Sequence, residues 1–318
     1  MKVLHVTPSF LPVVGGAEIN LNYLAKFSKK QGIDPIILTF NMNKRWSPKV
    51  EKNEVKFENI NVIKWPGLRP YPNIKFIRGI LPKFLGARII PGPTIRELFR
   101  SVDIIHFHDE VDLSFPISAL MIDVPKIMHI RTLNVLFDKF KKSILRRLIL
   151  SKIADLYICN STTTAKALMN LGIEKNKIDV IPNGVDPTIF SYNNKQSRKK
   201  RQLLFVGRMQ KEKGLHVILE ALKTIFPPIE LFIVVGAITD SNYYEQQKKK
   251  TIEINKEFGH KFVWKYSATH KELASLYQES TVFICPSFKE AFGNVNIEAM
   301  ACGAPVIATM SGGPIHNV

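Results

Sequence analysis

Two glutamates near the end of the chain, Glu290 and Glu298, are separated by seven residues and are placed for ligand binding. The apolar run 282–285 predicts a buried strand, and the run that starts at Asn294 predicts a helix that ends at Gly303. One carboxylate would then lie on the loop at the carboxyl end of a strand, and the other one turn into the next helix. Ligands bind at this edge of open α/β sheets, where a helix amino terminus favours a phosphate.

A basic loop earlier in the chain could supply the complementary charge. The apolar run 203–206 predicts a strand, and Gly207 and Arg208 follow it directly, with Lys213 five residues after the arginine. Two cations at the carboxyl end of a strand can together neutralise a diphosphate. Lys211 is a second candidate for the role of Lys213, and a solvated basic loop without a ligand remains the alternative.

The chain opens with the pattern of a βαβ unit. Residues 2–7 predict a strand, 17–31 a helix and 34–40 a second strand. The adjacent Gly15 and Gly16 stand between the first strand and the helix. Glycines allow the backbone to approach a ligand closely and can form an anion-binding nest, although a tight turn without a ligand would need them equally.

Two histidines end a further predicted strand, residues 103–109. Alternation along a strand places His106 and His108 on the same side of the sheet. We favour His108 as the functional residue because it is nearer the carboxyl end, whereas His106 serves equally well as a core residue. Arg131 stands at the end of the next predicted strand, residues 127–130.

Taken together, these motifs resemble the retaining nucleotide-sugar glycosyltransferases of family 4. The resemblance rests on the lead-in Pro286-Ser287, on the run Glu-Ala-Met-Ala-Cys-Gly-x-Pro-Val at 298–306, and on Pro-Asn-Gly-Val-Asp at 182–186. It extends to Gly15-Gly16 and to Arg208 and Lys213, which lie in the basic loop 207–214, called the cation loop below. The signature in the last third of the chain is its most specific part.

This resemblance implies an α/β protein with the GT-B fold, two facing Rossmann-like domains with parallel sheets and a cleft between them. Residues 1–185 would form the amino-terminal, acceptor-side domain, and residues 186–318 the nucleotide-sugar-binding domain. Family members usually continue with a helix that crosses back onto the first domain. The second domain is therefore expected to be incomplete at its end.

The resemblance also implies a role for each motif residue. The implied catalytic residues are His108, Glu290, Arg208 and Lys213. The implied donor-binding residues are Gly15, Gly16, Gly207, Arg208, Lys213, Glu290, Phe292, Gly293, Asn294 and Glu298. Arg208 and Lys213 would hold the diphosphate, Glu298 the ribose and Glu290 a hydroxyl of the donor sugar. Gly312-Gly313 is expected to approach the nucleotide, and no metal ligand is implied.

The implied activity is transfer of a hexose from a UDP-sugar or GDP-sugar to a sugar, glycan or lipid, as in polysaccharide or glycolipid biosynthesis. By resemblance, the configuration is retained, and neither a metal nor a cofactor is needed beyond the donor substrate. Two alternatives stay open: a nucleotide-sugar 2-epimerase on the same fold, and a non-catalytic nucleotide-sugar-binding subunit. The non-catalytic alternative is considered because the sequence stops at Val318, before the last elements usual in the family, and because His316 stands where the family commonly has a glutamate.

The sequence lacks the motifs of several other enzyme classes. It has no Asp-x-Asp pair, which argues against a metal-dependent GT-A transferase. It has neither a Gly-x-Gly-x-x-Gly run nor a Walker loop, the motifs of dinucleotide and P-loop enzymes. A glycosidase carboxylate pair fits less well than transfer, because cations for a diphosphate accompany the glutamates.

Composition limits the setting in which the protein works. The 318 residues are 45% hydrophobic and carry a formal charge of +18, which attracts anionic surfaces. Three scattered cysteines show neither metal spacing nor a disulfide framework, so a cytoplasmic location is expected. No apolar run approaches the length of a membrane span. The basic amphipathic stretch 137–152 predicts either peripheral contact with an anionic membrane or an ordinary surface helix. No reader motif supports nucleic-acid binding.

Overall fold

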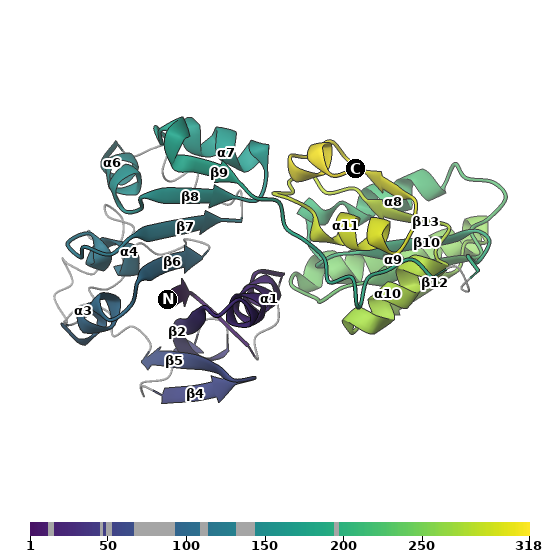
Figure 1. Ribbon diagram of the computed structural model, residues 1–318. Helices are drawn as coiled ribbons and strands as arrows, with labels where there is room; N and C mark the ends of the chain where they lie inside the picture. The colour runs from purple at the N-terminus through teal and green to yellow at the C-terminus, as the bar shows by residue number, and fades with distance from the viewer. Residues whose placement is uncertain are drawn as a thin grey trace. The chain divides into compact units, whose positions relative to one another are not determined.

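The computed structural model describes residues 1–11, 16–44, 47–48, 53–66, 93–108, 114–131, 144–193 and 197–318. Gly15 and the first part of the basic stretch, residues 137–143, lie outside these ranges. The chain divides into two compact units, Met1–Pro182 and Asn183–Val318, each built around one sheet (Figure 1). Along the chain, the division falls after Pro182, and the sequence predicted it after residue 185.

The first unit is a mainly parallel sheet. Its strand order is β4 (Asn53–Phe57), β5 (Ile60–Pro66), β2 (Asp34–Lys44), β1 (Lys2–Thr7), β6 (Ile104–His108), β7 (Lys126–Ile130), β8 (Leu156–Cys159) and β9 (Ile178–Val180), with β3 (Ser47–Pro48) paired to β2. Among the strands of the described residues, the β4–β5 and β2–β3 pairs are antiparallel and the others are parallel. The direction of the strand order changes beside β1, which pairs with both β2 and β6. Such a switch point is where α/β sheets bind ligands.

Helices pack against this sheet and complete its core. They are α1 (Gly16–Lys30), α3 (Pro93–Arg100), α4 (Ser114–Ala119), α6 (Ile144–Lys152) and α7 (Thr162–Met169), with a short 3-10 turn at Lys175–Lys177. Strands β1, β6 and β8 are mostly apolar because a parallel sheet is covered on both faces. Phe99 of α3, for example, meets Phe107 of β6 edge to face, and both are fully buried.

The second unit is an all-parallel sheet with the order β12 (Phe262–Lys265), β11 (Leu231–Val235), β10 (Gln202–Val206), β13 (Val282–Cys285) and β14 (Val306–Ala308). Its helices are α8 (Leu215–Leu222), α9 (Ser241–Phe258), α10 (His270–Glu279) and α11 (Asn294–Ala301), with 3-10 turns at Lys211–Lys213 and Gly313–His316. The chain moves outward from β10 in one direction and then returns to its other side at β13. The switch point of this sheet therefore lies between β10 and β13.

Local sequence explains where the helices of the second unit begin and end. Thr269 and Glu272 form a capping box at the start of α10. Gly293, with φ of +86°, is the N-cap of α11, and Gly303, with φ of +79°, follows its end. The strand–loop–helix unit predicted around the two glutamates is confirmed.

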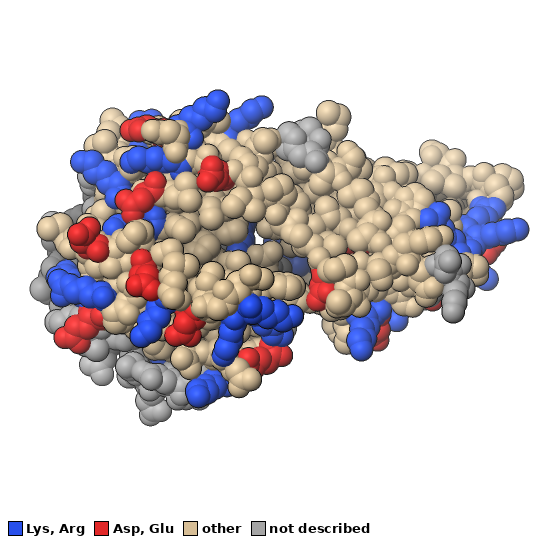
Figure 2. Space-filling view, viewed as in Figure 1, with Lys and Arg blue, Asp and Glu red and all other residues tan. Residues whose placement is uncertain are grey.

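Charge is mixed on the visible surface. On the face drawn in Figure 2, acidic and basic side chains of the first unit lie side by side rather than as a patch of one sign. Within the described ranges, no helix is both long and apolar enough to cross a membrane.

Candidate functional site

An ion pair lies at the carboxyl ends of two neighbouring strands of the second unit. Lys213 follows β10 and Glu290 follows β13, and their Nζ and Oε2 atoms are 2.6 Å apart. The side chains are 19% and 18% exposed, so both remain within reach of a ligand. A phosphate oxygen can compete for the ammonium, and a sugar hydroxyl can donate to the carboxylate. The pair thus brings together two residues that the sequence assigned to one ligand.

Backbone contacts fix the two loops that carry this pair. Gly214 has a φ of +75°, and a Cβ there would lie 2.1 Å from the carbonyl oxygen of Pro286. The N–H of Gly207 donates to Val235 at 2.9 Å, and a Cβ on Gly236 would lie 1.8 Å from the Gly207 carbonyl oxygen. These close approaches leave no room for side chains and hold the cation loop against the neighbouring strand ends.

The loop of Glu290 is also held from its other side. Its N–H donates to the carbonyl of Ser311 at 2.9 Å, and its own carbonyl accepts from the N–H of Gly313 at 2.7 Å. A Cβ on Gly313 would lie 2.4 Å from the nitrogen of Phe292. The close approach of the Gly312-Gly313 pair is therefore to the loop that carries Glu290.

Glu298 lies on α11 beside a buried tyrosine. The Tyr277 hydroxyl of α10 donates to Glu298 Oε2 at 3.3 Å. Burial raises the pKa of Glu298 to about 7, and the hydrogen bond from Tyr277 opposes that rise. The carboxyl group is therefore in balance between its two protonation states near neutral pH. Tyr277 was missed by the sequence analysis, because only the packing of α10 on α11 brings it to Glu298.

The remaining residues predicted for the donor site differ in exposure and in the partners they contact. Arg208 is exposed and has no ion pair among the described residues. Lys211 is exposed too, so Lys213 is the lysine that the fold brings to Glu290. Phe292 is buried with 5% exposure, which leaves its backbone rather than its ring for a ligand. The Asn294 Oδ1 accepts from Asn183 Nδ2 at 2.9 Å, at the first turn of α11.

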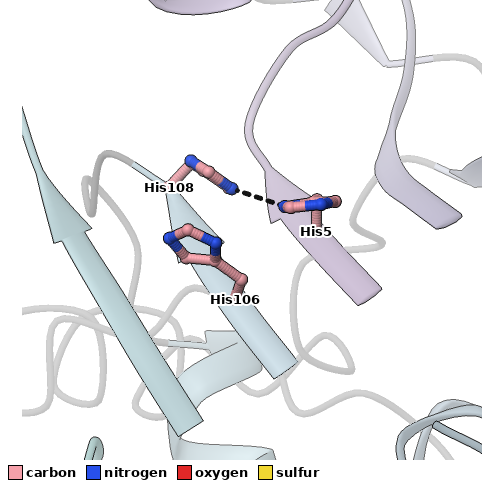
Figure 3. A group of neighbouring side chains, drawn as sticks. All are labelled: His5, His106 and His108. Carbon is pink, nitrogen blue, oxygen red and sulfur yellow. Dashed lines mark hydrogen bonds between the residues drawn. The ribbon is translucent and has the colours of Figure 1, made fainter. Parts of the chain in front are cut away.

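A cluster of histidines occupies the switch point of the first unit (Figure 3). His5 of β1 is the register partner of His106 of β6, and His108 is the partner of His129 of β7. His5 Nδ1 and His108 Nε2 form a 3.0 Å hydrogen bond, and the His106 and His108 rings lie 4.1 Å apart. The prediction that His106 and His108 share one side is confirmed. His5 and His129 were missed because a single sequence does not give the register between strands.

The surroundings of these imidazoles favour their neutral form. Burial, and to a lesser extent Arg131, lowers the pKa of His5 to about 4. Burial likewise holds the pKa of His106 and of His108 well below the usual value, with the neighbouring cationic groups adding to the effect. At neutral pH the cluster therefore offers uncharged nitrogens.

Three of these histidines form a possible set of metal ligands. His5, His106 and His108 each offer a nitrogen, and these atoms lie within 4.8 Å of one another. A ligating imidazole normally donates its second N–H to a partner, but His5 Nε2, His106 Nε2 and His108 Nδ1 are buried without one. Besides burial, the positive charge of Arg131 lowers the pKa of all three imidazoles, and this charge also repels a cation. The cluster fits a divalent cation poorly.

Family models cover nearly the whole chain. The model of Glycosyltransferase Family 4 matches residues 14–189, and that of Glycosyl transferases group 1 matches residues 189–318. The chain belongs to glycosyltransferase family 4. Within this family it is 32% identical to an uncharacterized glycosyltransferase of Methanocaldococcus jannaschii, over 98% of the chain and 80% of that relative. It is also 32% identical to the D-inositol 3-phosphate glycosyltransferase of Pseudarthrobacter chlorophenolicus, but over 48% of the chain and only 39% of that protein's length.

Solved structures of other transferases share the fold of this family 4 chain. HepE of Anabaena, solved in complex with UDP and glucose, is 20% identical, with a TM-score of 0.73 over 100% of this chain and 83% of that one. Sucrose-phosphate synthase of Thermosynechococcus elongatus is 20% identical, with a TM-score of 0.68 over 98% and 82% of the two chains. The expected GT-B fold is thereby confirmed.

Proposed function

We propose that this chain is a retaining glycosyltransferase that moves a hexose from a nucleoside-diphosphate sugar to a sugar, glycan or lipid acceptor, without a metal. The observation that carries the proposal is the ion pair of Lys213 and Glu290 at the switch point between β10 and β13, in the loops that lead into α8 and into α11, the helix that carries Glu298. A cation for a diphosphate and carboxylates for hydroxyls are the complement of such a donor.

In the proposed reaction, the bond between the anomeric carbon and the diphosphate oxygen breaks, and negative charge develops on the leaving diphosphate. Arg208, Lys213 and the N–H groups at the start of α11 stabilise that charge. The acceptor hydroxyl oxygen forms the new bond on the same face of the sugar, and its proton passes to the departing phosphate. Glu290 holds a donor hydroxyl and Glu298 the ribose. We assign His108, with the first unit, to the acceptor side.

UDP-glucose is the first donor to test, because the structural neighbour HepE has been solved with it. We further propose that the protein works in the cytoplasm at an anionic membrane surface, for which the formal charge of +18 is the support. Co-sedimentation with vesicles that contain anionic lipid tests this location. Equal recovery with purely zwitterionic vesicles would remove the support for it.

The activity test measures release of free nucleotide from UDP-hexoses and GDP-hexoses, with chelator present, across a panel of acceptors. Arg208→Ala is expected to lower kcat/KM about 100-fold, because the developing diphosphate charge loses a partner. Arg100→Ala, at an exposed position at the end of α3, is the control and should turn over like the wild type.

Three outcomes would contradict parts of the proposal. Unchanged turnover by Arg208→Ala would show that the diphosphate assignment is wrong. Conversion of the donor without any acceptor would favour an epimerase. Donor binding without turnover across the panel would favour a nucleotide-sugar-binding subunit.

A further inference from the structure

We infer that Tyr277 is a positioning residue for nucleotide binding: its hydroxyl orients the Glu298 carboxylate toward the ribose of the donor. This inference rests on the proposed function and adds a residue to the nucleotide site proposed there. It explains why residue 277 carries a hydroxyl, since a phenylalanine would fill the same space in the core.

The surroundings of Tyr277 make it a rigid donor. Its side chain is fully buried, and its ring lies edge-on to Phe283 of β13 at 5.3 Å and at 6.3 Å from Phe190. A ring clamped from two sides cannot swing its hydroxyl toward another acceptor. The 3.3 Å hydrogen bond to Glu298 therefore ties the carboxylate on α11 to the core of α10 and β13.

The bond also decides which part of the carboxylate is left for a ligand. It engages Oε2 of Glu298, and Oε1 accepts no hydrogen bond from the described residues. With one oxygen held, rotation of the carboxylate is restricted and Oε1 is left for the ligand. A pair of neighbouring hydroxyls, as in a ribose, is the group that such an acceptor suits.

The charge of Glu298 adds a measurable consequence. Burial raises its pKa to about 7, whereas accepting ligand hydroxyls favours the ionised form and lowers that pKa. Binding near neutral pH must therefore release a proton. The other titratable groups around the pair are Cys302 of α11 and Cys285 at the end of β13, and burial raises the pKa of both thiols, so they stay neutral. Glu298 is therefore the side chain that releases a proton, in addition to any that the nucleotide's own terminal phosphate loses, since the second pKa of a phosphate is about 6.

The test is calorimetric titration with UDP and, separately, with GDP, in buffers of different ionisation enthalpy, which reports proton release directly. At pH 7 the wild type should release a measurable fraction of a proton per nucleotide, since the Glu298 carboxyl is partly protonated beforehand. Tyr277→Phe keeps the ring but removes the hydrogen bond that favours the charged carboxylate. It should weaken binding about 3- to 10-fold and increase the proton release.

Two further variants separate this inference from a packing effect and from the proposed function. Tyr244→Phe removes another tyrosine hydroxyl of the second unit, one on α9 that is partly buried and bonded to Tyr266 at 2.9 Å, and this variant should match the wild type. Glu298→Gln should bind weakly and release only the proton fraction that the nucleotide's own terminal phosphate loses, less than the wild type.

The outcomes separate the two proposals. Binding of neither nucleotide to the wild type overturns the proposed function and this inference with it. Nucleotide binding in which Tyr277→Phe matches Tyr244→Phe, in affinity and in proton release, overturns this inference alone.

Discussion

The Lys213 ammonium serves two partners in the proposed reaction. Glu290 holds it at 2.6 Å, and the donor diphosphate would draw it at the moment when charge develops. We expect Lys213→Gln to lower kcat/KM about 100- to 1,000-fold, because it removes a cation from the leaving group and leaves the Glu290 carboxylate unpaired. The effect should fall mainly on kcat, which steady-state kinetics with the verified donor will show.

The neighbouring Lys211 provides the matched control. It has the same charge on the same turn, but it is exposed and is not the partner of Glu290. Lys211→Gln should therefore change kcat/KM by about twofold or less, the level expected when an exposed charge is removed. Equal losses in the two variants would mean that the loop acts through its total charge and that the assignment of Lys213 is wrong.

At the scale of elements, the site depends on a glycine that lets the cation loop touch the strand end beside it. Gly214 joins the turn Lys211–Lys213 to α8, and its would-be Cβ lies 2.1 Å from the carbonyl oxygen of Pro286. Gly214→Ala must separate the two loops. We expect it to destabilise the second unit by about 3 kcal/mol and to weaken nucleotide binding. Urea unfolding and calorimetry check the two effects.

Substitution of Gly259 is the control that separates the effect of the steric clash at Gly214 from the effect of backbone strain. Its φ is also +75°, but a Cβ there would meet nothing closer than Pro228 at 3.4 Å. Gly259→Ala should cost about 1 kcal/mol, the strain of the left-handed conformation alone, and should leave nucleotide binding unchanged. A loss of binding in this variant as large as in Gly214→Ala would show that general destabilisation explains both.

The elements also show how far a single sequence leads. Apolar runs and glycine stops predicted the strand, loop and helix around Glu290 and Glu298, because these signals are local. The contact between Lys213 and Glu290 spans 77 residues, and the contact between Tyr277 and Glu298 depends on how two helices pack. The resemblance to family 4 placed the two glutamates and the two cations at one ligand, but it said nothing of Tyr277 or of the partners of His108.

At the scale of the molecule, the buried titratable groups of the two units respond to acid in opposite directions. The pKa of His5 is lowered from 6.5 to about 4, and those of His106, His108 and His129 are lowered too. Between the unfolded and folded pKa values, the unfolded first unit binds more protons. Its stability is therefore present above pH 6.5 and is lost as the pH falls toward 4. In the second unit, the raised pKa of Glu298 favours the folded state as the pH falls through 7.

We therefore expect acid to destabilise the first unit selectively, by about 1 kcal/mol per pH unit for each imidazole that stays neutral. Hydrogen exchange followed by mass spectrometry, corrected for the intrinsic rate at each pH, resolves the two units. Between pH 6.5 and 4.5, peptides from β1 and β6 should lose protection, whereas those from β10 and β13 should retain it. The double variant His5→Gln/His106→Gln should flatten the pH dependence of the first unit. Equal loss of protection in both units, unaffected by that variant, would mean that the buried histidines do not set the acid stability of the protein.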